Sequence, residues 1–243
     1  DFTASSMTLR GQGNAKGNSS PKGNFKYGTD PNLTDGSTTS TSQKDPTSNS
    51  LNTNVDLASE TISTGINGAT IYYYQAIVNA GGKTKNGAIK SVLTKPAAPT
   101  SVALTLDGTA GTLTFSEPSK GSNVALSYTI SCTSSDGGAT VSTTGNAASY
   151  NLTGFTSGKT YSCSVYATSA ASGTTVDAGG GAGASASSSS KSVKAAPVAT
   201  TDVADSITAT SFVAKGTANP KGNNGGSGQF IYSATSTDLT SNT

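Results

Sequence analysis

The chain contains no histidine and no tryptophan, and only two cysteines and one methionine, among 243 residues. Histidine is the usual general base of enzymes and the usual partner of a nucleophilic serine or cysteine, so its absence removes the commonest catalytic pairs. Serine and lysine are abundant, but no motif singles out one Ser/Lys pair. The sequence therefore predicts a protein that is not an enzyme and that holds no cofactor and no metal.

Charge is also scarce, because charged residues make up 12% of the chain and 15 basic against 13 acidic residues leave a net charge of +2. The basic residues form no run of the kind that a nucleic-acid-binding face needs. Asp30, Asp35 and Asp45 are spread along one segment, so we expect solvated turn residues rather than a calcium site. No apolar stretch approaches the ~18–20 residues that span a bilayer. Neither a nucleic-acid partner nor a membrane span is predicted.

Helical periodicity is almost absent, whereas alternation of apolar and polar residues occurs throughout the chain. Leu126, Tyr128, Ile130 and Cys132 fall on one face of an expected strand, and residues 161–167 alternate in the same way. This period, broken by Gly, Asn and Asp, is typical of β-sandwiches. The apolar fraction of 33% suits thin two-layer domains. The alternative, disorder of a Ser- and Gly-rich chain, is disfavoured by the many alternating segments.

An internal repeat relates the two ends of the chain. Residues 2–27 align with residues 207–232 without a gap at an offset of 205, and 11 of the 26 positions are identical. Two similar Pro/Ala segments, 95–99 and 194–197, predict short stiff linkers. The repeat and the linkers together indicate an array of small units in the order A, B, A.

Three units follow from these boundaries. Residues 1–95 are expected to form a type A sandwich that lacks its first strand, 96–195 a type B sandwich, and 196–243 the incomplete N-terminal part of a second type A sandwich. Because three strands cannot close a sandwich, the last unit should not be stable alone. The chain opens at Asp1 rather than Met, so we expect a window cut from a longer polypeptide. The alternative is strand donation between subunits, for which only residues 197–204 could serve.

Strands are expected at regular intervals in both larger units. The predicted strands are 3–13, 23–29, 51–62, 70–79 and 88–94 in the first unit, and 101–106, 112–115, 125–133, 140–144, 149–152, 159–168 and 187–194 in the second. The segment 177–190 is rich in Gly, Ala and Ser, and part of it is expected to be a long flexible loop.

Both larger units carry the same spacing in front of a tyrosine. Ile66 precedes Tyr72 by six residues, and Phe155 precedes Tyr161 by six, each time across a turn that contains glycine. The pattern resembles the tyrosine corner of Greek-key sandwiches, in which the hydroxyl bonds back to the backbone of the turn. Tyr72 and Tyr161 are therefore the expected corner residues.

The type B unit resembles a bacterial fibronectin type III domain. The motifs that carry this resemblance are residues 99–102, 115–118, 128–130, 158–161 and 165–167. The type A units resemble a related immunoglobulin-like repeat of microbial surface proteins, through Gly-x-x-Asn-x-x-Gly, Phe-x-Tyr, Thr-x-Tyr and residues 79–82. The resemblance implies an all-β fold of tandem immunoglobulin-like and fibronectin type III sandwiches joined by short Pro/Ala linkers.

The same fold places strands 125–133 and 159–168 side by side in antiparallel order. Cys132 and Cys163 both fall on the inward face of these strands, so a cross-strand disulfide is within reach if they lie opposite one another. Two cysteines in a Ser/Thr-rich chain fit one disulfide and an oxidising compartment. The alternative is a pair of buried free thiols.

The sequence contains candidate residues both for covalent glycosylation and for glycan binding. Asn18 and Asn32 begin Asn-x-Ser/Thr words and are candidate glycosylation sites, whereas Asn151 is expected to be too packed for modification. Tyr73 and Tyr166 are out of phase with their inward neighbours, so they are candidates for an aromatic platform that binds glycan. The alternative, which we favour, is that these outward rings cover a sheet face and pair across strands.

These observations predict an extracellular or cell-surface structural component of a microbial fibre, stalk or surface layer, built as a rod of tandem repeats. Its expected partners are copies of the same chain or neighbouring repeats. The alternative is an adhesin, or a spacer or carbohydrate-binding module of a secreted multidomain protein, with a glycan as partner. Filaments in electron micrographs would favour the first function, and a monomeric rod that binds glycan would favour the second.

Overall fold

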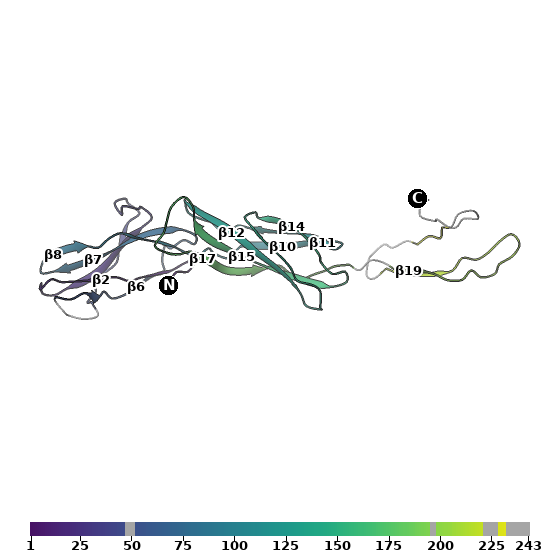
Figure 1. The fold of residues 1–243 in the computed structure, drawn as a ribbon, viewed down its shortest axis with the longest axis horizontal. Helices are drawn as coiled ribbons and strands as arrows, with labels where there is room; N and C mark the ends of the chain where they lie inside the picture. Colours follow the sequence, from purple (N-terminus) through teal and green to yellow (C-terminus); the bar gives the residue numbers. More distant parts are fainter. Residues whose placement is uncertain (47–51, 195–197, 221–227, 232–243) are drawn as a thin grey trace.

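The computed structural model describes residues 1–46, 52–194, 198–220 and 228–231. This part of the chain contains strands and no helix, which confirms the expected all-β class, and so it has no helix that could cross a membrane. Two sandwiches follow one another along the long axis, and a separate strand pair lies beyond the second (Figure 1).

The first sandwich is built by nine strands. They are β1 (Met7–Leu9), β2 (Gln12–Gly13), β3 (Lys22–Gly28), β4 (Thr39–Ser40), β5 (Val55–Asp56), β6 (Glu60–Ile62), β7 (Ile71–Ala80), β8 (Lys83–Asn86) and β9 (Lys90–Leu93). In one layer β1 pairs with β6 and β2 with β5, and the facing sheet runs β9-β7-β3-β4 with β8 on the end of β7. Met7, Leu9, Phe25, Tyr72 and Val92 are buried between the layers.

The second sandwich is built by eight strands. They are β10 (Thr100–Asp107), β11 (Ala110–Ser116), β12 (Val124–Ser134), β13 (Val141–Gly145), β14 (Ser149–Thr153), β15 (Thr160–Ala171), β17 (Gly181–Ser187) and β18 (Lys191–Ser192). The layer β10-β11-β14 faces β13-β12-β15-β17, with β18 also on β15. Along β15, Tyr161, Cys163, Val165 and Ala167 are buried in alternation, which confirms the period-two pattern of the sequence.

The second sandwich contains one strand that the sequence did not predict. β18 lies inside the predicted strand 187–194, but Gly181–Ser187, within the segment expected to be partly a flexible loop, is β17 and also pairs with β15. The sequence missed β17 because this segment contains only Gly, Ala and Ser, so its side chains give no hydrophobic period. Backbone hydrogen bonds form the ladder without help from large side chains.

The third unit is described only in part, as two antiparallel strands. They are β19 (Val198–Thr201) and β20 (Gly216–Asn219). Residues 232–243, where the sequence predicts that this unit ends, lie outside the described residues.

Apolar side chains of the third unit are exposed where their repeat counterparts are buried. Phe212 is 50% and Phe230 52% exposed, whereas Met7 and Phe25, 205 positions earlier, are 0% and 1% exposed. In the first sandwich β6, β7 and β9 cover these positions, and the described part of the third unit holds no counterpart of those strands. The described strands of this unit therefore enclose no core of their own.

Candidate functional site

The two sandwiches meet where a short strand from the second pairs with the sheet of the first. β16 (Ala178–Gly179) belongs to the loop between β15 and β17, yet it pairs in parallel with β9 of the first sandwich. Ala178 lies opposite Val92 and Gly179 opposite Leu93, and the Gly180 N–H donates to the Leu93 carbonyl at 2.7 Å. The segment predicted to be a flexible loop thus forms the edge strand of the neighbouring sheet.

Asp177, the residue immediately before β16, fixes this strand to the first sandwich. Its Oδ1 lies 3.0 Å from Lys90 Nζ, and its Oδ2 accepts hydrogen bonds from the backbone N–H of Ser91 at 2.8 Å and from Ser91 Oγ at 2.9 Å. These contacts, the Ser91 N–H first, lower the pKa of Asp177 to about 2. The carboxylate therefore joins the two sandwiches most firmly when it is ionised.

We expect the junction to loosen as the pH falls from about 4 to about 2. The pKa of Asp177 is lowered from 3.8 to about 2 by these contacts, so its stabilisation is complete above pH 4 and is lost as pH falls through the lowered value. X-ray scattering across this range should show the two sandwiches gaining freedom to bend. Asp177→Asn should already bend at pH 7, whereas Asp30→Asn, at another low-pKa carboxyl, should keep the transition.

A small apolar cluster lies beside this strand, separate from the two sandwich cores. Ala69, Ile71 and Leu93 of the first sandwich and Val124 of the second are each at most 7% exposed. Part-buried side chains pack around them, namely Tyr73, Leu126, Ala171 and Val176. Burial of these groups from both sides resists separation of the sandwiches.

Buried polar groups of the junction are paired across it. Ser169 Oγ of the second sandwich donates to the Thr94 carbonyl at 3.1 Å, and Ser169 is 3% and Thr94 0% exposed. The Gly121 N–H donates to the Ala69 carbonyl at 2.9 Å. Because an unpaired buried polar atom is costly, these bonds fix one relative placement of the sandwiches.

Three consecutive glycines allow the strand to approach so closely. Gly179, Gly180 and Gly181 have φ of 92°, 77° and 92°, a region that side-chain-bearing residues rarely adopt. A Cβ on Gly179 would lie 2.1 Å from the Leu93 carbonyl oxygen. The sequence alone assigned no role to Asp177 or to these three glycines. The run of consecutive glycines is the one feature of the sequence that could have indicated a close approach of two backbones.

The predicted cysteine pair lies in the middle of the second sandwich. Cys132 on β12 is directly opposite Cys163 on β15, both are 0% exposed, and a disulfide of 2.00 Å joins them. The structure thus brings together two residues that the sequence separates by 31 positions.

Both predicted corner tyrosines bond to turn backbone. Tyr72 Oη accepts from the Asn67 N–H at 2.9 Å and donates to the Gly65 carbonyl at 3.3 Å. Tyr161 Oη accepts from the Thr156 N–H at 3.0 Å, but it donates to Ala139, on the turn after β12, at 3.0 Å. The corner of the second sandwich therefore joins two turns rather than one.

Tyr161→Phe is expected to destabilise the second sandwich by about 1–3 kcal/mol, because it leaves a donor and an acceptor unpaired beside a buried ring. Tyr166→Phe on the same strand is the control, and its change should stay within about 0.5 kcal/mol because Tyr166 is half-buried. Chemical denaturation followed by tyrosine fluorescence measures both. Equal losses in the two variants would contradict the bridging role of the Tyr161 hydroxyl.

The candidate glycosylation residues differ in their surroundings. The Asn18 side-chain nitrogen donates to the Ala15 carbonyl at 2.7 Å in a part-buried turn, and a sugar on this nitrogen would leave it one N–H for this bond. Asn32 is exposed. Asn151 is also exposed, on β14, so the expectation that packing covers it was wrong.

The two tyrosines that were candidates for a glycan-binding platform, Tyr73 and Tyr166, do not belong to one sheet. Tyr73 on β7 lines a cleft of about 410 Å³ at the junction, and Tyr166 on β15 lies opposite Thr129 and Ser185.

Asp30 caps a turn, since the N–H groups of Thr34 and Asn32 bond to its carboxylate and lower its pKa to about 2.

Comparison with known proteins supports the assignment of the second sandwich. Residues 97–177 match the family model of the fibronectin type III domain. No curated protein matches the chain. The structure is similar to the chicken CNTN1 FN1-FN3 domains, at 11% identity and a TM-score of 0.32 over 75% of this chain and 56% of that one. It is also similar to domains A168-A170 from titin, at 14% identity and a TM-score of 0.37 over 79% and 60% of the chains. The chain thus spans less than two thirds of either structure.

Proposed function

We propose that this chain is a structural component of an extracellular microbial fibre, stalk or surface layer, in which tandem β-sandwiches form a rod. The observation that carries this proposal is the junction, where β16 of one sandwich completes the sheet of the other. A tether between independent binding modules needs only a linker, whereas a rod that transmits force needs its modules held in one orientation.

Three further features support the same role. The sandwiches follow one another lengthwise rather than side by side, so each added unit extends the rod (Figure 1). Residues 97–177 match the fibronectin type III domain, which is common in multidomain structural and adhesive proteins. The disulfide between Cys132 and Cys163 fits an oxidising, extracellular compartment.

Electron microscopy and light scattering of the purified chain over a range of concentrations test this proposal. Elongated particles that join lengthwise as concentration rises are the expected result. Particles that stay monomeric at every concentration and bind immobilised glycans would overturn it in favour of an adhesin or carbohydrate-binding module. The variant Asp177→Asn should give particles that bend, because the contacts of Asp177 with Lys90 and Ser91 are weakened.

A further inference from the structure

The cleft at the junction is lined by both sandwiches. The first sandwich contributes Tyr73 of β7, Thr70 just before this strand, and the turn after β3. The second sandwich contributes Ser122 and Asn123 of the turn before β12. The volume of about 410 Å³ lies in the range of about 300–1,000 Å³ that is usual for small-ligand sites, and such sites are common between domains.

Hydrogen bonds hold both walls of the cleft in place. On the side of the second sandwich, the Gly121 N–H donates to the Ala69 carbonyl at 2.9 Å, and the Ser172 N–H donates to the Asn123 carbonyl at 2.8 Å. On the opposite side, the Asp30 carboxylate accepts hydrogen bonds from three backbone N–H groups of its own turn. The cleft is therefore already formed, and a ligand does not have to order its walls.

The side chains of the cleft keep free hydrogen-bonding groups. Within the described residues, the hydroxyls of Tyr73 and Ser122 and the amide of Asn123 bond to no other group. The Thr70 hydroxyl donates to the Gly68 carbonyl at 3.0 Å and can still accept a hydrogen bond. Asn123 has a φ of 57°, a region that Asn tolerates better than most residues, and its amide offers both donors and an acceptor.

The cleft is uncharged. Of the described residues that line it, none carries a charge, and the neighbouring charged groups bond elsewhere. Lys90 and Asp177 pair with one another at 3.0 Å, and Lys120 Nζ donates to the Val124 carbonyl at 2.7 Å. A charged ligand would lose its hydration in the cleft without gaining a counter-charge, so the cleft fits an uncharged ligand.

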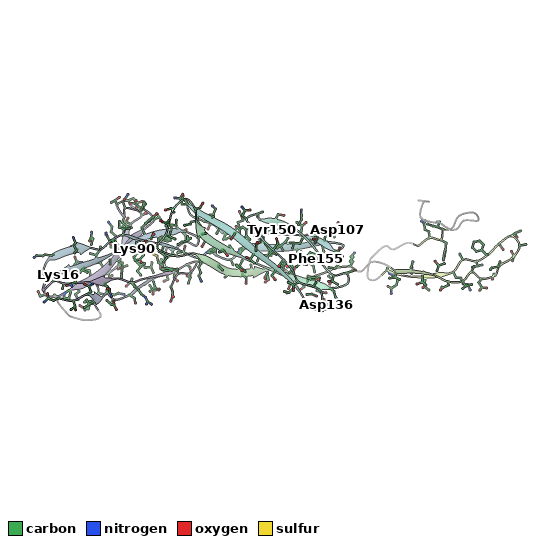
Figure 2. All side chains as sticks on the ribbon, viewed as in Figure 1. Lys16, Lys90, Asp107, Asp136, Tyr150 and Phe155 are labelled. Carbon is green, nitrogen blue, oxygen red and sulfur yellow. A yellow bond between two sulfur atoms is a disulfide. The ribbon has the colours of Figure 1, made fainter. Side chains whose placement is uncertain are left out.

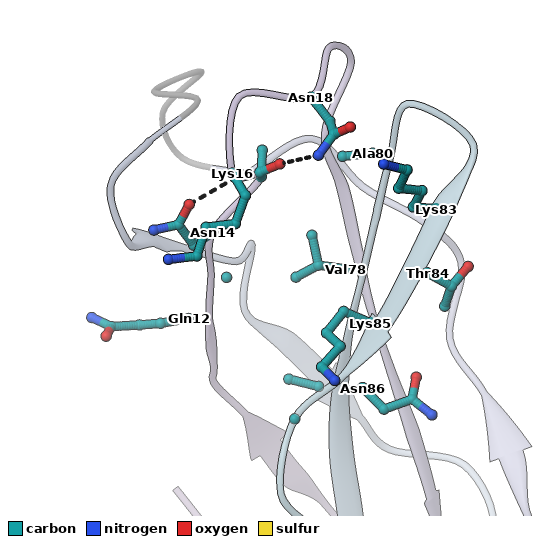
Figure 3. A pocket seen from close by; sticks show the side chains of 14 residues that line it. Gln12, Asn14, Lys16, Asn18, Val78, Ala80, Lys83, Thr84, Lys85 and Asn86 are labelled. Atoms are coloured by element: carbon teal, nitrogen blue, oxygen red, sulfur yellow. Dashed lines mark hydrogen bonds between the residues drawn. The ribbon is translucent and has the colours of Figure 1, made fainter.

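Charged side chains lie at other places along the rod. Lys16 marks the outer end of the first sandwich, and Asp107 and Asp136 mark the end of the second sandwich that faces away from the junction (Figure 2). A groove at the outer end of the first sandwich is lined by Lys16, Lys83 and Lys85 (Figure 3). Because these ammonium groups favour anions, neutral and anionic probes distinguish the cleft from this groove.

We propose that the junction cleft binds a neutral saccharide and that the bound sugar stiffens the junction. A sugar ring has an apolar face for the Tyr73 ring, and its hydroxyls donate and accept in the same way as the groups of Ser122 and Asn123. The inference goes beyond the proposed structural role, because one chain supplies every residue of the cleft whether or not chains join lengthwise.

Binding in the cleft is linked to the rigidity of the junction. Since the two walls belong to different sandwiches, the cleft depends on the placement that the β16–β9 ladder and the contact of Leu93 with Val124 fix. A ligand that binds only this closed placement stabilises it. By the same linkage, a substitution that opens the junction weakens binding.

An array of immobilised glycans tests the class of ligand. The probes are neutral oligosaccharides of glucose, galactose, mannose and N-acetylglucosamine, beside sialylated and sulfated ones. The unmodified chain should bind one or more of the neutral probes. Binding to the anionic probes alone, or to none, would overturn the proposal. Lengthwise assembly is measured separately, so the structural role stands or falls independently of this result.

Substitutions locate the site. Asn123→Asp should weaken binding of the strongest neutral probe by at least about tenfold in titration calorimetry, because it replaces an amide donor by a charge, while Asp tolerates the same φ region. Asn146→Asp is the matched control, since it makes the same change at an exposed position outside the cleft. Loss of binding in Tyr166→Ala with no loss in Asn123→Asp would place the sugar on β15 and overturn the proposal.

Limited proteolysis tests the link to the junction. With the same neutral probe at about ten times its Kd, cleavage within 177–183 should slow by about tenfold, because the ligand raises the population of the closed form by about 1 + [L]/Kd. Gly179→Ala should weaken binding more than Gly181→Ala, because a Cβ on Gly179 alone meets the β9 backbone. Binding that leaves the cleavage rate unchanged would refute the stiffening.

Discussion

Removal of the disulfide is expected to lower the free energy of unfolding of the second sandwich by about 3–4 kcal/mol. The bond closes a loop across 31 residues, and such a cross-link restricts the unfolded chain by about this amount in the loop-entropy account. For a sandwich of this size the loss corresponds to a drop of roughly 12–30 °C in Tm. The effect is large because it approaches the whole stability of a small domain.

Calorimetry of the oxidised chain and of chain reduced in denaturant and refolded measures this effect. The first sandwich contains no cysteine, so its transition is an internal reference that should respond little to reductant. The variant that combines Cys132→Ala with Cys163→Ala should show a lowered Tm of the second sandwich, and reductant should not change this Tm further. Coincident traces for oxidised and reduced chain would show that packing of β12 against β15, and not the bond, supplies the stability.

Strands with large side chains on one face could be predicted closely from the sequence. β12 and β15 were expected at 125–133 and 159–168 and run Val124–Ser134 and Thr160–Ala171. Most of their inward positions hold aromatic, branched or sulfur-bearing side chains, whose alternation reveals the period and the buried face. The cysteine pair became predictable for the same reason, since register follows once the inward face and the strand order are known.

The junction could not be predicted, because its strand carries no such signal. Residues 177–183 hold one carboxylate and a run of Gly and Ala, a composition that is common in unstructured loops. What makes them a strand is the edge of β9 and the side chain of Ser91, which lie 86 positions away in sequence. Tertiary pairing of this kind overrides local preference, and a single sequence does not display it.

Gly179→Ala is expected to release the second sandwich from the sheet of the first. The new Cβ would lie 2.1 Å from the Leu93 carbonyl oxygen, so β16 cannot stay paired with β9. Once this ladder opens, Asp177 also loses Lys90 and Ser91, since their bonds depend on the same placement. Limited proteolysis within 177–183 should become at least about tenfold faster, because cleavage follows the population of the opened segment.

Gly181→Ala supplies a closely matched control for this effect. Gly179 and Gly181 share a φ of 92°, so alanine meets the same unfavourable backbone region at both positions, worth about 1–2 kcal/mol. A Cβ on Gly181 meets nothing within 4 Å, whereas the Cβ on Gly179 meets the β9 backbone. A larger increase in cleavage and in bending for Gly179→Ala therefore isolates the contact from the backbone strain. Equal behaviour of the two variants would instead assign the rigidity of the junction to the side-chain packing of Leu93 against Val124, because neither new Cβ contacts these two side chains.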